Sequence, residues 1–188
     1  MITVVSDQRL RELERKWRES GSLMDEAAYL RERVRVGDLT QERLELAAAF
    51  GHAPSRIATG CDWPVMRWHT LEALAEGSHC ARAWILTALA ELAVRELSKR
   101  PWARQWYRSS GAAKQPAVEV IKGLLEFPPV SGLPNGLSQL ALVIGEDARA
   151  STFHPSVLRD ARRVFGWNRL RSALEALVPV LLASPDDP

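Results

Sequence analysis

The sequence predicts an all-α protein, and three observations lead to that fold class. Apolar side chains recur every three or four residues over most of the 188-residue chain, which is the period of an amphipathic helix. Glycine and proline stand between these segments, where helices end and begin. No Asn-Gly or Asp-Gly turn lies between two alternating runs, so β-hairpins are not expected. We therefore expect a multi-helix orthogonal bundle or a short HEAT-like helical array, as a single domain over residues 1–183 with a disordered tail at 184–188.

Two amphipathic helices are predicted at the N-terminus. The first carries leucine and tryptophan along one face, with Ser6 or Asp7 as its N-cap and Gly21 as its end. The second covers residues 23–36, and Gly37 ends it because glycine readily adopts the left-handed conformation that closes many helices. Tight turns between helices of this kind favour an orthogonal bundle.

Two shorter helices follow. Asp38 or Thr40 is the expected N-cap of the next helix, which ends near Gly51. A single helical turn over residues 54–59 then ends at Gly60.

The middle of the chain contains its most apolar segment. A helix opens at residues 62–64, where proline stands near the first helical position, and ends at Gly77. Ser78 is the expected N-cap of a helix over residues 79–99 that is apolar on nearly every face. Because such a helix must be covered on all sides, we place it at the centre of the fold.

The C-terminal half predicts further helices between proline and glycine breaks. Pro179 stands inside the last one and should kink it or end it early. The expected segments are a short helix and loop over 102–115, then helices over 116–125, 137–150, 155–165 and 167–183.

Composition and charge exclude several classes of protein. Apolar residues make up 46% and charged residues 26% of the chain, close to the averages of globular domains. The longest strongly apolar run covers only residues 83–94, whereas a membrane-spanning helix needs about 20 residues. The net charge of +2 is spread evenly, so bulk charge favours neither nucleic acid nor an anionic membrane. With no secretory signal pattern at the N-terminus, we expect a cytoplasmic protein with no membrane partner.

The basic and aromatic stretch over residues 95–114 is the leading candidate for a functional surface. Arginine, tryptophan and tyrosine are the residues enriched at protein interfaces, and they also suit stacking on single-stranded nucleic acid. The alternative is that the tryptophans pack inward while the arginines remain solvated. Exposure of Trp102 and Trp106 would distinguish these interpretations. The candidate partner-binding residues are Arg100, Trp102, Arg104, Trp106, Tyr107 and Arg108.

Arginine accounts for 21 of the 25 basic residues of the chain. Most of this excess is scattered and balanced by acidic residues, which is typical of genome composition. A second local group stands out beside residues 95–108 and favours an anion-facing surface. Its members are Arg159, Arg162, Arg163, Arg169 and Arg171.

Two groups of residues are candidates for a metal site or a catalytic site. Cys61, His69, His79 and Cys80 are zinc-type ligands, but they lack the paired short spacings that place two ligands in one turn. His69 shares a helix face with Glu72 and Glu76, although such a face is more often a solvated stripe. We expect no metal and no cofactor.

A third pattern matches a short nuclease signature. Arg149 and His154 stand at the Arg-x4-His spacing of HEPN ribonucleases, in which arginine would hold a phosphate and histidine would move a proton. Ala150 stands where that signature usually has a polar residue, and Pro155 favours an extended His154. No phosphate-binding loop, dinucleotide fingerprint or nucleophile elbow is present. An enzyme is therefore not the favoured interpretation.

The N-terminal region resembles a module found in other helical proteins. The residues that carry the resemblance are Trp17–Gly21, Glu26–Ala48 and Gly51-His52. This stretch is similar to uncharacterised all-helical proteins of myxobacterial-type genomes. The resemblance implies a helical scaffold and a bacterial cytosolic setting, with no activity attached.

Three functions follow from the sequence as hypotheses. The first is a protein-binding helical module, for example an immunity or regulatory partner of a toxin or enzyme. The second is RNA or single-stranded DNA binding through residues 95–114. The third is a HEPN-like ribonuclease.

Overall fold

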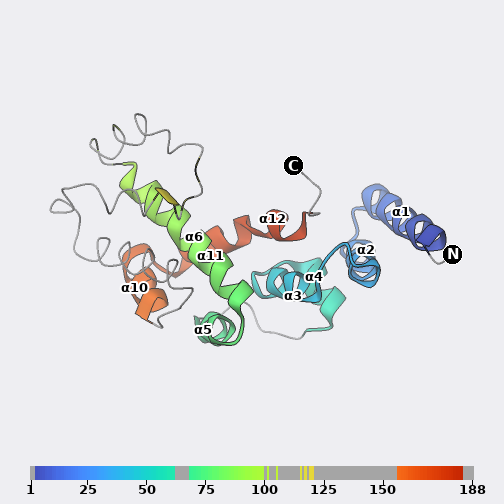
Figure 1. Cartoon of the computed structure of the whole chain (residues 1–188), viewed down its shortest axis with the longest axis horizontal. Coiled ribbons are helices and arrows are strands. Elements are labelled where there is room, and N and C mark those ends of the chain that lie inside the picture. Colours follow the sequence, from blue (N-terminus) through green and yellow to red (C-terminus); the bar gives the residue numbers. More distant parts are fainter. Residues whose placement is uncertain are drawn as a thin grey trace. The chain divides into compact units, whose positions relative to one another are not determined.

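The computed structural model describes residues 3–61, 68–99, 101, 105, 115, 117, 119–120 and 156–183 (Figure 1). The predicted all-α class is confirmed, since the described part contains helices and no strand. Its helices are α1 (Thr3–Ser20), α2 (Leu23–Val36), α3 (Gln41–Ala49), α4 (Ala53–Thr59), α5 (Trp68–Gly77), α6 (His79–Leu97), α10 (Ser156–Phe165), α11 (Trp167–Ala176) and α12 (Val178–Leu182).

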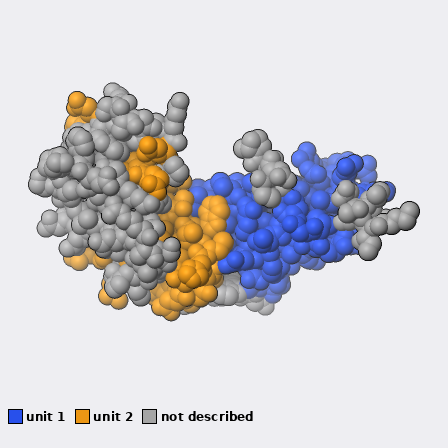
Figure 2. All heavy atoms as spheres, in the orientation of Figure 1, with its two compact units in different colours: residues 1–70, 175–188 blue, residues 71–174 orange. Residues whose placement is uncertain are grey.

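The chain divides into two compact units, coloured separately in Figure 2. Unit 1 comprises residues 1–70 and 175–188, so it joins the two ends of the chain, and unit 2 comprises residues 71–174. The single domain expected over residues 1–183 stays a prediction, and the tail at 184–188 lies outside the described residues.

Most of the predicted helix ends in unit 1 are confirmed. The Ser22 hydroxyl caps α2 by accepting a hydrogen bond from the Met24 amide, and Gly37 closes the helix at φ +86°. Thr40 caps α3 by accepting from the Arg43 amide, which leaves Asp38 for a different partner. Short polar side chains and a left-handed glycine thus perform the roles that their positions predict.

The predicted start of the first helix is wrong. Ser6 or Asp7 was the expected N-cap, but α1 already begins at Thr3, so both residues lie inside it. No glycine or proline precedes Ser6, and nothing therefore interrupts the helical hydrogen bonding upstream of it.

Proline acts at the C-terminus as expected, by ending one helix early. The predicted helix over 167–183 is divided into α11 and α12 at Leu177. Pro179 lies in the first turn of α12, where its missing N–H would have no helical acceptor in any case.

The core of unit 1 brings distant segments together. α2 packs against α1 and α4, and α3 packs against α4 and α12. Leu30, Leu39 and Leu44 form a buried cluster, and Leu182 from α12 packs against it. Burying these leucines drives the C-terminal helix onto the N-terminal ones.

Unit 2 contains the apolar helix that the sequence places at the centre. Residues of α6 are buried around most of its circumference, as an all-round apolar helix requires. Ser78 caps it by accepting from the Ala81 amide. Within the same unit, the Glu96 carboxylate at the end of α6 pairs with Lys99 at 2.7 Å and with Arg169 of α11.

We expect Gly37→Ala to lower the free energy of unfolding by about 1 kcal/mol, because a Cβ is disfavoured at positive φ. A Cβ at this site would meet no atom within 4 Å, so the effect isolates backbone strain from steric collision. Gly37→Asn is the matched control and should cost less, since asparagine tolerates the left-handed region. Urea denaturation measures both variants, and equal costs would contradict the backbone explanation.

Candidate binding pocket

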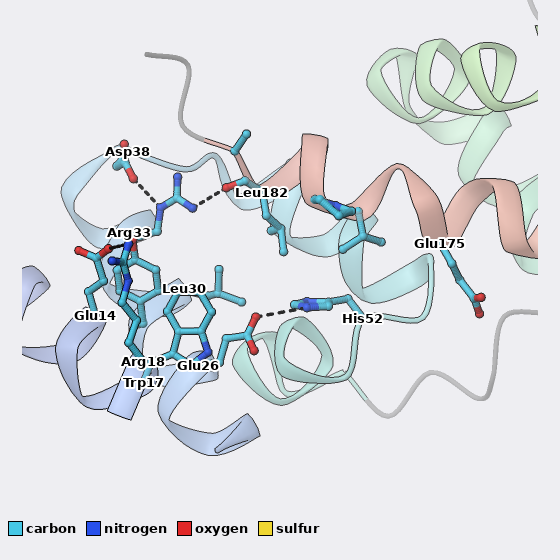
Figure 3. A pocket seen from close by; sticks show the side chains of 14 residues that line it. Glu14, Trp17, Arg18, Glu26, Leu30, Arg33, Asp38, His52, Glu175 and Leu182 are labelled. Carbon is cyan, nitrogen blue, oxygen red and sulfur yellow. Dashed lines mark hydrogen bonds and ion pairs between the residues drawn. The ribbon is translucent and has the colours of Figure 1, made fainter. Parts of the chain in front are cut away.

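Unit 1 contains a pocket of about 710 Å³ between α1, α2 and α12, close to the N-terminus of α4 (Figure 3). Its size lies in the range of ligand sites. Both ends of the chain contribute to it. The lining residues are Glu14, Trp17, Arg18, Glu26, Tyr29, Leu30, Arg33, Asp38, His52, Glu175, Val178, Pro179, Leu182 and Ala183.

An aromatic pair forms one side of the pocket. The rings of Trp17 on α1 and Tyr29 on α2 stack with centroids 5.2 Å apart and planes 16° apart. The Arg33 guanidinium lies 5.8 Å from the centre of the Tyr29 ring, within cation–π range. These contacts restrict the aromatic side chains, so this wall of the pocket is preorganised.

Arg33 is the most constrained charged group of the pocket. Only 6% of it is exposed, and its Nε donates to Asp38 Oδ2 at 2.5 Å. Its Nη1 donates to the carbonyl oxygen of Leu182 at 2.5 Å, as the dashed lines in Figure 3 show. The planar guanidinium can serve both acceptors at once, and it links α2 to the end of α12.

A second arginine holds the same end of α12. Arg43 on α3 donates through Nη2 to the carbonyl oxygens of Val180, at 2.9 Å, and Ala183, at 3.1 Å. The last carbonyls of a helix have no partner within it and carry partial negative charge. Two guanidiniums from α2 and α3 therefore satisfy the C-terminal end of α12.

Contacts among three side chains connect α2 to α4. His52 Nε2 lies 3.3 Å from Glu26 Oε1, and His52 Nδ1 is hydrogen-bonded to Ser55 Oγ at 2.8 Å. In the neutral tautomer with the proton on Nε2, that N–H faces the Glu26 side chain, and Ser55 donates to Nδ1.

Burial shifts the pKa values of His52 and Glu26. Burial lowers the pKa of His52 below its usual 6.5, because the positive form is poorly solvated there. Burial is also the larger effect on Glu26 and raises its pKa, while a hydrogen bond from the Trp17 side chain lowers it. His52 is therefore mostly neutral at pH 7, and Glu26 loses its proton at a higher pH than an exposed glutamate does.

Glu26, His52 and Ser55 resemble a catalytic acid–histidine–serine triad, but they are not placed to act on a substrate. Ser55 is fully buried, so its hydroxyl cannot reach a substrate. Both ring nitrogens of His52 are engaged, so neither is directed at a bound molecule. The geometry instead ties the start of α4 to α2.

NMR titration of the four histidines should show a midpoint for His52 below 6.5, with His52→Gln identifying its signal. The unfolded chain then binds this proton before the folded one does. The free energy of unfolding consequently falls as the pH drops below 6.5 and levels off once the folded His52 is protonated. A midpoint above 6.5 would mean that Glu26 holds His52 as a cation.

The six candidate partner-binding residues of the sequence lie outside the described residues: Arg100, Trp102, Arg104, Trp106, Tyr107 and Arg108. The same holds for Arg149 and His154 of the ribonuclease pattern.

The second arginine group is described and lies on α10 and α11. Arg159, Arg162 and Arg163 are exposed one turn apart on α10, while Val157 and Phe165 of the same helix are buried. Three arginines at i, i+3 and i+4 share one face of a helix.

The zinc-type ligands and the acid/base face lie only partly within the described residues. The side chain of His69 is outside them, so its relation to Glu72 and Glu76 is not described. Cys61 and Cys80 are both reduced and partly buried. Within the described ranges, no three histidine, cysteine, aspartate or glutamate side chains are grouped as a metal ion would require.

Comparison of the chain with protein-family models, with curated proteins and with solved structures finds no match. None of the helices in the described part is long and apolar enough to cross a membrane.

No sequence pattern predicts this pocket. Its residues come from α1, α2, the start of α4, the end of α11 and α12, so no short-range spacing connects them. The only local signal is the presence of Trp17, Tyr29 and Arg33 on consecutive helices, which by itself equally predicts core packing.

Proposed function

We propose that this chain is a helical protein-binding module that uses the pocket of unit 1 as its contact site. The observation that carries the proposal is a preorganised pocket that combines a stacked aromatic pair with fixed charges, Trp17 and Tyr29 beside Arg33 and Glu26. Aromatic side chains in rigid pockets are typical anchors of protein interfaces.

An exposed leucine on α2 supports contact with a large partner. Leu23 is 51% exposed, and it shares a face of α2 with the lining residues Glu26 and Leu30, at i+3 and i+7. An exposed leucine on that face adds apolar area that a partner would cover. The engaged nitrogens of His52 and the burial of Ser55 favour binding over catalysis at this site.

The partner class that we propose is another cytoplasmic bacterial protein, a toxin or enzyme that this chain neutralises or regulates. The products of neighbouring genes are the first candidates. Each should be purified and titrated against the full chain by isothermal calorimetry.

Two matched variants test where the partner binds. Leu23→Glu adds a charge to the face of α2 that carries Glu26 and Leu30, and Met24→Glu adds the same charge at another exposed residue, about 100° further round the helix. We expect at least about tenfold weaker binding for the first variant, equal to 1.4 kcal/mol, and no change for the second. Failure of every neighbouring product to bind would overturn the proposed function, and equal effects of the two variants would exclude the pocket.

A second candidate function is favoured by the exposed arginines of α10. Arg159, Arg162 and Arg163 offer closely spaced cations that suit nucleic-acid phosphates, in addition to the stretch over 95–114. Filter binding of a single-stranded RNA at two salt concentrations tests it. Retention that falls steeply with salt and is lost on changing the three arginines to glutamine is the expected result, and no retention removes this candidate.

A further inference from the structure

Two ion pairs account for both guanidiniums in the lining of the pocket of unit 1. Glu14 pairs with Arg18 at 2.6 Å along α1, and Arg33 pairs with Asp38 at 2.5 Å. The Glu26 carboxylate, which also lines the pocket, pairs with neither guanidinium.

Glu26 is the carboxylate whose surroundings need explanation. Its side chain is only 19% exposed, and the partners recorded for it among the described residues are the Trp17 indole and the neutral His52 ring. A carboxylate has acceptor sites for about four hydrogen bonds, so Glu26 retains capacity for a further donor. Holding an ionised carboxylate away from water costs free energy unless a cation compensates it.

The surroundings of Glu26 suit an organic cation with an apolar stem. Trp17 lies beside Glu26 (Figure 3), and tryptophan is the ring that attracts cations most strongly. Leu30 and Leu182 provide apolar lining for a hydrocarbon chain. A volume of about 710 Å³ accommodates a long side chain together with adjoining backbone. An anion would meet the Glu26 carboxylate and would be repelled.

We infer that the pocket of unit 1 binds a lysine or arginine side chain of the partner protein, with the Glu26 carboxylate as its counter-charge and the Trp17 ring beside it. This inference rests on the proposed protein-binding function and adds the chemistry of the residue that is recognised. The partner then presents a basic residue at the centre of its contact surface, and Leu23 covers apolar surface around it.

NMR titration of the full chain with a blocked amino acid tests the inference directly. N-acetyl-arginine methylamide is the cationic probe, and N-acetyl-citrulline methylamide is its neutral near-isostere. The reporter is the indole N–H signal of Trp17, identified among the seven tryptophans by Trp17→Phe. We expect a saturable shift with the arginine probe and none with the citrulline probe.

Two glutamate variants complete the experiment. Glu26→Gln keeps the shape and the acceptor oxygen, and should weaken binding of the arginine probe at least about tenfold. Glu19→Gln removes an equivalent charge from the exposed surface of α1, where Glu19 is 70% exposed, and should change nothing. Equal shifts with both probes, or equal affinities for wild type and Glu26→Gln, would overturn the inference.

The two proposals fail in distinguishable ways. A neighbouring protein that binds wild type and Glu26→Gln equally would leave the protein-binding function intact and remove the basic-residue inference. Tight, Glu26-dependent binding of the arginine probe without any protein partner would leave the cation site and remove the protein-binding function.

Discussion

Replacing Arg33 with methionine is expected to lower the free energy of unfolding of unit 1 by about 3 kcal/mol. The substitution removes the guanidinium that donates to the Asp38 carboxylate and the Leu182 carbonyl, while the methionine retains most of the buried side-chain volume. Asp38 is 30% exposed, so water compensates part of the loss, and the effect stays below that of a fully buried pair.

Loss of the Arg33 hydrogen bonds should release α12 in particular. Hydrogen exchange measured by mass spectrometry over residues 177–183 should become faster in Arg33→Met than in wild type. Arg33→Lys should accelerate hydrogen exchange almost as much, because one ammonium group cannot donate to both acceptors in the geometry of the planar guanidinium. Arg31 on the same helix is exposed, so Arg31→Met is the control and should change the stability by less than about 1 kcal/mol. Unchanged exchange in Arg33→Met would show that Arg33 does not hold α12.

Replacing Leu44 with alanine is expected to cost about 3 kcal/mol of stability, within the range measured for buried leucines. Leu44 is 1% exposed and belongs to the cluster with Leu30 and Leu39, against which Leu182 packs. The cavity removes contacts from helices at both ends of the sequence, so unit 1 should lose stability as a whole.

Leu23→Ala is the matched control for this cavity. Leu23 is 51% exposed, and its truncation should change the free energy of unfolding by no more than about 0.5 kcal/mol. Denaturant unfolding followed by far-ultraviolet circular dichroism measures both variants. Similar losses for Leu44 and Leu23 would contradict the assigned core.

The local structure of unit 1 could be predicted because its signals are local. Gly21, Gly37 and Gly60 all adopt positive φ at helix ends, and Ser22 and Thr40 cap the helices that follow. Each of these roles depends only on the residue type and its neighbours in the chain. The error at α1 has the same origin, because a residue that can cap a helix does so only where the chain also stops being helical.

The sequence offers several partners for some polar side chains, and only the folded structure shows which partner each one binds. Asp38 and Thr40 were equal candidates for the cap of α3, and the position of Arg33 decides between them by binding Asp38. The even scatter of most of the arginines indicates genome composition and predicts no role for any one of them. Two of them, Arg33 and Arg43, close the end of a helix more than a hundred residues away in the chain.

Helix positions, helix ends and the all-α class thus follow from periodicity and capping, which act over a few residues. The pocket does not, because it exists only once burial of Leu30, Leu39 and Leu44 has brought α12 back to the N-terminal helices. Glu26 and His52 acquire their shifted pKa values from that same packing, since burial is the main cause in both. Burial between packed helices, which no local pattern encodes, places the Glu26 side chain of α2 beside Trp17 of α1.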